Sequence, residues 1–79
     1  MINFKNKKIF IGGAGGFIGG HLVKKLLNLG ANIVAVDIKP INLWFQLFEN
    51  VENHSLDLKN LKNCEEVIKD CDFVFNMAC

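Results

Sequence analysis

The feature that most constrains the fold is a glycine-rich stretch, GGAGGFIGG, at residues 12–20. It follows the short apolar run KIFI at residues 8–11, which is typical of a buried parallel strand. Over residues 17–29 the apolar side chains recur at helical spacing, and Gly30 stands where helices often stop. The chain is therefore predicted to begin with a strand, a glycine turn and a helix.

The rest of the chain continues this alternation. Further strands are predicted at residues 32–38, 54–56 and 72–78, with helices at residues 42–48 and 60–69. Such an order favours parallel strands joined by right-handed crossovers. We expect an α/β fold, a Rossmann-type parallel sheet with flanking helices that stops after about four strands. In this topology the strand at residues 72–78 lies beside the strand at residues 8–11.

The spacing of the glycines predicts a dinucleotide site. Gly13, Gly16 and Gly19 obey the pattern GxxGxxG, which allows a sharp turn, a close approach of the backbone to a diphosphate, and tight packing of the helix on the sheet. The helix N-terminus offers N–H groups and a partial positive charge to the anion. Asp37 ends the next predicted strand, where an acid that binds the adenosine ribose is expected.

The same residues allow other interpretations. Asp37 would repel a 2′-phosphate and so favours NAD over NADP, although Lys39 could receive such a phosphate. Asp37 could also simply cap its strand. No GK[ST] follows the glycines, which excludes a P-loop, and the loop of a methyltransferase Rossmann domain usually differs from this one.

The sequence resembles the extended short-chain dehydrogenase/reductases, the NAD-dependent epimerase/dehydratase family. The resemblance covers the whole chain and rests on GGAGGFIGGHL at residues 12–22, VDIK at 36–39, SLDL at 55–58 and DFVFNMAC at 72–79. Within that family the chain looks most like the branch of the GDP-mannose 3,5-epimerases. The 79 residues would then be the N-terminal part of the NAD-binding domain, without the substrate lobe and the catalytic part.

The resemblance assigns roles to individual positions. Residues that would contact the diphosphate are Gly13, Gly16, Phe17 and Ile18, with Gly19 packing behind them. Asp37 would bind the ribose, and Asp57 and Leu58 the adenine edge, while Met77 and Ala78 would form the wall beneath. Family enzymes transfer a hydride between NAD and a sugar carbon with the help of a YxxxK motif, but this chain has no tyrosine. We therefore expect no catalytic residue here, and a nucleotide-sugar substrate only in a full-length context.

Composition narrows the remaining possibilities. A net charge of +1 gives no reason to expect a nucleic acid or an anionic membrane as partner. The three cysteines, Cys64, Cys71 and Cys79, fit neither a disulfide framework nor a CxxC metal or redox pair, and we interpret them as reduced thiols of a cytoplasmic protein. No metal is expected. A strand missing beside residues 72–78 would leave a sheet edge through which the chain could self-associate.

Three functions remain open from the sequence. The first is the NAD-binding portion of a nucleotide-sugar epimerase or dehydratase, which alone is not expected to catalyse. The second is a stand-alone dinucleotide-binding module, and the third is a non-functional remnant of a split gene. Trp44 and Phe45 either cover the adenine side of the pocket or fill the core, and we favour the core.

Overall fold

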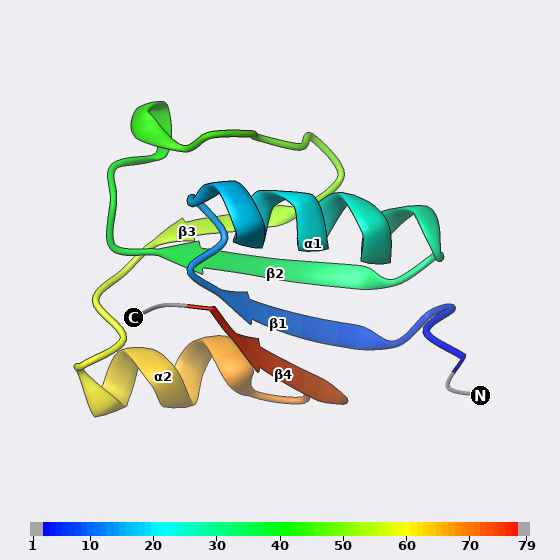
Figure 1. Cartoon of the computed structure of the whole chain (residues 1–79). Helices are drawn as coiled ribbons and strands as arrows, with labels where there is room; N and C mark the ends of the chain where they lie inside the picture. Colours follow the sequence, from blue (N-terminus) through cyan, green and yellow to red (C-terminus); the bar gives the residue numbers. More distant parts are fainter. Residues whose placement is uncertain (1–2, 78–79) are drawn as a thin grey trace.

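In the computed structural model, residues 3–77 are described, and they form a parallel sheet with a helix on each face (Figure 1). The strands are β1 (Lys8–Gly12), β2 (Asn32–Asp37), β3 (Glu52–Ser55) and β4 (Phe73–Asn76). The helices are α1 (Phe17–Asn28) and α2 (Leu61–Ile68), with a short 3₁₀ turn, η1, at Ile41–Leu43. The strand order is β3-β2-β1-β4, which confirms the predicted Rossmann-type topology and places β4 beside β1.

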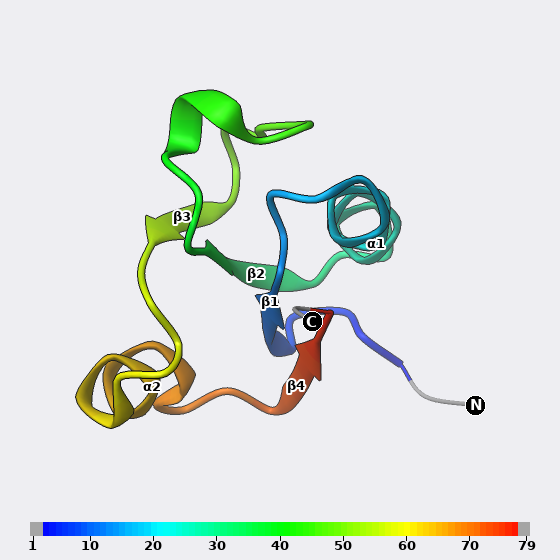
Figure 2. The same ribbon diagram turned by 60° about the vertical axis from the view of Figure 1, so that its left-hand side comes forward.

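The two helices lie on opposite faces of the sheet (Figure 2). On the α1 face, Ile9, Ile11 and Ile33 pack against Val23 and Leu26 of the helix. On the α2 face, Phe10, Val34 and Val36 pack with Val67. The side chains of β1 and β2 therefore alternate between two small cores, which is why both strands are almost wholly apolar.

The helix ends follow from local chemistry. Helix α1 ends at Asn28, and Gly30 adopts a left-handed φ of 86°, as the sequence suggested for this glycine. Helix α2 begins after Asn60, whose side chain accepts a hydrogen bond from the Asn63 N–H at 3.3 Å.

The boundaries of two predicted strands change slightly. Strand β3 covers Glu52–Ser55 rather than residues 54–56, because its pairing with β2 starts where Glu52 lies opposite Val34. Strand β4 covers Phe73–Asn76, and Ala78, which ended the predicted strand, lies outside the described residues.

The prediction of a helix at residues 42–48 is wrong. After the 3₁₀ turn, Trp44 adopts an extended conformation, and the Phe45 N–H donates to the Gly15 carbonyl at 2.9 Å instead of to its own segment. Trp44 is buried in the core on the α1 face, as predicted, whereas Phe45 is 56% exposed, so the prediction of a core position for Phe45 is also wrong. The apolar residues of this segment are thus distributed by their contacts with the glycine turn and not by a helical repeat.

Candidate functional site

The turn between β1 and α1 is built by glycines at two positions in particular. Gly13 adopts φ 77°, a left-handed conformation that other residues rarely take. Its carbonyl accepts a hydrogen bond from the Gly16 N–H at 3.2 Å. A Cβ atom on Gly19 would overlap that same carbonyl oxygen, so only glycine lets the helix start this close to the turn.

Helix α1 presents its N-terminus without a side-chain cap. Gly16 is the N-cap, no side chain caps it, and the first turn holds no acidic residue. The first N–H groups of a helix have no intrahelical partner and attract anions. Phe17 and Ile18, which open the helix, are 61% and 66% exposed. The end of α1 is therefore suited to a negatively charged group.

Gly16 differs from the other glycines of the turn. A Cβ placed on it would meet only the Gly13 carbonyl oxygen, at an ordinary distance of 3.5 Å. The protein itself therefore does not require a glycine at this position. A ligand lying against the turn would supply the missing reason, since it could approach the backbone only if no side chain were there.

Asp37 ends β2 and is 8% exposed. Its Oδ2 atom accepts a hydrogen bond from the Gly15 N–H at 2.9 Å, and its Oδ1 atom accepts one from the Lys39 N–H at 3.0 Å. A carboxylate has about four acceptor positions, so capacity remains for further hydrogen bonds. Asp37 thus ties the glycine turn to the end of β2 and still borders the cavity described next.

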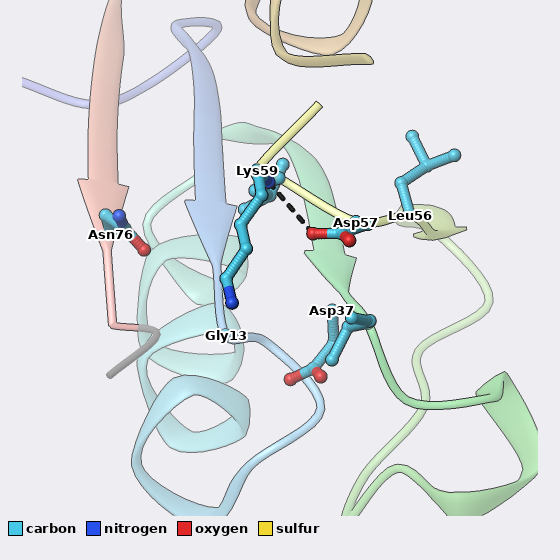
Figure 3. Close-up of a pocket in the computed structure, with 8 residues that line it drawn as sticks. Gly13, Asp37, Leu56, Asp57, Lys59 and Asn76 are labelled. Carbon is cyan, nitrogen blue, oxygen red and sulfur yellow. Dashed lines mark hydrogen bonds between the residues drawn. The ribbon is translucent and has the colours of Figure 1, made fainter. Parts of the chain in front are cut away.

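A cavity of about 300 Å³ lies at the carboxyl ends of the strands (Figure 3). In an open parallel sheet this is where ligands bind. Four of the predicted site residues line it together: Gly13, Asp37, Asp57 and Leu58. The sequence did not point to the other four lining residues, Ile38, Leu56, Lys59 and Asn76. Ile38, Leu56 and Asn76 lie at the end of a strand or directly after it, and that position could have identified them, whereas Lys59 lies in the turn before α2.

The loop at residues 56–59, after β3, forms a second part of the rim of the cavity. Hydrogen bonds hold this loop in place. The Asp57 Oδ1 atom accepts a hydrogen bond from the Lys59 N–H at 2.9 Å, and the Cys64 thiol contacts the Leu58 carbonyl oxygen at 2.8 Å. Figure 3 shows the Lys59 side chain pointing into the cavity. The rim therefore combines an acidic and a basic side chain on an exposed loop.

The remaining predicted residues lie beside the cavity without lining it. Gly16, Phe17 and Ile18 stand at the start of α1, and Gly19 is buried behind them. Met77 follows β4, is 40% exposed, and donates its N–H to the Gly12 carbonyl at 2.8 Å. Ala78 lies outside the described residues.

The thiols do not form a reactive or metal-binding cluster within residues 3–77. Cys64 and Cys71 are free. Burial raises the pKa of the Cys71 thiol, and the nearby Lys8 ammonium offsets this only in part. No group of three or more His, Cys, Asp or Glu side chains in residues 3–77 is placed to hold a metal ion. Over the same residues, neither helix has the length and apolar character needed to cross a membrane.

Known proteins match this chain in sequence and in structure. The sequence pattern of the NAD dependent epimerase/dehydratase family matches residues 9–79. GDP-mannose 3,5-epimerase of Arabidopsis thaliana is 38% identical over 74 residues, which are 94% of this chain and 20% of that protein. The chain therefore spans about a fifth of the length of the curated relatives it matches.

Solved structures agree in fold. The epimerase Mth375 of Methanothermobacter thermautotrophicus superposes with a TM-score of 0.83 at 25% identity, covering 96% of this chain and 24% of that one. The enzyme WbmF of Bordetella bronchiseptica, in complex with NAD+, superposes with a TM-score of 0.79 at 26% identity. That match covers 98% of this chain and 24% of WbmF.

Proposed function

This chain belongs to the NAD dependent epimerase/dehydratase family, and on that basis we propose that it binds the adenosine diphosphate half of NAD for a nucleotide-sugar epimerase or dehydratase. The observation that carries the proposal is the cavity bounded by Gly13 and Asp37, next to the uncapped N-terminus of α1. An anion-binding helix end, a buried carboxylate and an apolar recess match the diphosphate, ribose and base of one nucleotide.

The residues present fit this cofactor. The start of α1, from Gly16 to Ile18, would hold the diphosphate, and the open space beside Gly16 leaves room for it. Asp37 would accept hydrogen bonds from the ribose hydroxyls. Residues placed around the base would be Asp57 and Leu58 at its edge, with Met77 beneath it. When bound, NAD would accept a hydride from a sugar carbon and return it.

We propose NAD as the preferred form of the cofactor over NADP. The buried Asp37 carboxylate would repel a 2′-phosphate, and its position is held by two backbone N–H groups. Lys39 belongs to the same segment and contacts Asp37 through its backbone N–H.

We propose that the 79 residues bind NAD without catalysing a reaction. The sequence contains no tyrosine, whereas the YxxxK chemistry of the resembled family needs one. The nucleotide sugar would meet the cofactor only in a full-length context. The free thiols Cys64 and Cys71 support a reducing, cytoplasmic setting.

Calorimetric titration of the full chain tests this function. NAD and ADP-ribose are expected to bind with similar affinity, because both carry the adenosine diphosphate half, and nicotinamide mononucleotide is not expected to bind. NADP should bind about tenfold more weakly than NAD. Asp37→Ala should weaken NAD binding by at least tenfold. Equal affinity for NAD and nicotinamide mononucleotide, or unchanged affinity in Asp37→Ala, would contradict the assignment.

A further inference from the structure

The segment that follows β2, residues 39–46, packs against the glycine turn, and we call it the strap. Figure 1 shows the chain leaving β2 and returning alongside α1. The Gln46 side chain lies 3.6 Å from where a Cβ on Gly20 would be, so the strap reaches the second turn of the helix. Its two central residues, Trp44 and Phe45, make the contacts that matter here.

Both main-chain polar groups of Gly15 are engaged. Its N–H donates to the Asp37 carboxylate at 2.9 Å, and its carbonyl accepts from the Phe45 N–H at 2.9 Å. Gly15 is therefore held on one side by β2 and on the other by the strap. The exposed Phe45 side chain is not needed for this hydrogen bond, because the bond uses only its backbone.

Trp44 closes the arrangement. The residue is 9% exposed, and its indole Nε1–H donates to the Lys39 carbonyl at 2.9 Å. Lys39 in turn donates its own N–H to Asp37 at 3.0 Å. A single buried ring thus fixes both the start of the strap and the residue that orients the second carboxylate oxygen.

The indole also explains why residue 15 is a glycine. A Cβ on Gly15 would lie 2.8 Å from Cδ1 and 2.9 Å from Cγ of Trp44, closer than real Cβ contacts allow. Gly15 is not among the glycines with positive φ, so alanine would fit its backbone. The obstacle to a side chain is therefore chiefly Trp44, with the Asp37 carboxyl carbon at 3.0 Å behind it.

We propose that Trp44 is a positioning residue for the cofactor: it locks Gly15 and the Asp37 carboxylate in the geometry that receives the diphosphate and ribose. The effect on the cofactor rests on the proposed function, but the contacts that hold Gly15 and Asp37, which we call the lock, are present without a ligand. Because Trp44 is the only tryptophan in the chain, its fluorescence reports on the lock directly.

Amide hydrogen exchange on the ligand-free chain tests the lock. In Trp44→Leu, the Gly15 and Phe45 amides should exchange at least tenfold faster, while the Asn32 and Met77 amides, which donate to Lys7 and Gly12, keep their rates. Trp44→Phe keeps a ring without the N–H donor and should show a smaller increase. Leu47→Ala, an exposed position just beyond the strap, is the matched control and should change neither amide. Unchanged Gly15 exchange in both Trp44 variants would overturn the proposal.

A double-mutant cycle tests the consequence for the cofactor. Gly15→Ala should lower NAD affinity about tenfold in the wild-type background, and less than twofold in the Trp44→Leu background, where the indole no longer obstructs the added methyl group. Additive effects would overturn the coupling. If the wild-type chain binds no NAD, the proposed function fails, whereas the exchange experiment still decides whether Trp44 holds the turn.

Discussion

Strand β1 and helix α1 are more deeply buried than strand β3 and helix α2, the later pair. Four of the five residues of β1 are buried, and α1 buries Gly19, Gly20, Val23 and Leu26. In the later pair, β3 has no buried residue and α2 buries only Val67. The turn after β1 is therefore supported by a core, whereas the loop after β3 is anchored by the half-buried Leu56 and Leu58, which pack against the smaller core on the α2 face, and by hydrogen bonds.

This difference divides the candidate site into a fixed part and an adaptable part. In the proposed function, the glycine turn, α1 and Asp37 would meet the diphosphate and the ribose of the dinucleotide. The loop at residues 56–59 borders the cavity from the weakly packed side. Regions with few buried apolar contacts open more easily than the core. We therefore expect the rim to adjust around the base while the turn stays in place.

The largest loss of stability is expected for Gly19→Ala, a substitution in the fixed part of the site. The added Cβ would overlap the Gly13 carbonyl oxygen, and neither the turn nor α1 can move without disturbing the core. Overpacking of this kind costs about 3 kcal/mol. Urea denaturation followed by circular dichroism should show a chain that is largely unfolded or strongly destabilised. Wild-type stability in Gly19→Ala would show that the turn is not fixed.

A smaller and more selective effect is expected for Gly16→Ala. Its Cβ meets no close protein atom, so the free energy of unfolding should change little, while NAD affinity should fall about tenfold because the methyl group stands where the diphosphate approaches. Gly20→Ala is the control on the same helix, since its nearest atoms lie 3.6 Å away. Equal loss of affinity in both variants would remove the diphosphate from Gly16.

We propose that β4, at the sheet edge opposite β3, is a point of self-association. Within residues 3–77 this strand pairs only with β1, and Val74 on it is 55% exposed. Sedimentation velocity at rising concentration should show association of the wild-type chain, and Val74→Lys should reduce it, because a charge on an edge strand opposes pairing. A wild-type chain that stays monomeric would contradict this.

The smallest effect concerns the pH dependence of stability. Burial raises the pKa of the Cys71 thiol above its ordinary value of 9.0. The folded chain therefore keeps the thiol proton where the unfolded chain loses it, so this contribution to stability is intact below pH 9.0 and declines as the pH rises through the folded pKa. Cys71→Ser should show a shallower decline above that pH in urea titrations. Identical slopes would show that Cys71 does not couple folding to pH.

The sequence was sufficient for the strands and the helix that carry the fixed part of the candidate site. Glycine spacing, helical periodicity and β-branched runs predicted β1, α1, β2 and the strand order, because these elements are determined by local propensity and burial. Asp37 was found by its place at the end of β2. Its hydrogen bonds to Gly15 and Lys39 were not predictable, since they depend on how the loop returns to the turn.

The segment at residues 42–48 shows where sequence reasoning stops. Its large apolar residues suggested a helix, yet Trp44 enters the core and Phe45 faces outward beside Phe17, with ring centres 4.8 Å apart. Tertiary contacts with the glycine turn outweigh the local pattern. Lys59 likewise borders the cavity because of the turn that precedes α2, which no local pattern predicted.

Mapping NAD binding by backbone amide chemical shifts tests the central claim most directly. Upon addition of NAD or ADP-ribose, saturable shifts are expected at the carboxyl ends of the strands, concentrated at residues 13–18, 37–39, 56–59 and 76–77. Residues around Lys8 and Asn50, at the opposite end of the sheet, should not move. Absence of saturable shifts, or shifts centred on Lys8 and Asn50, would contradict it.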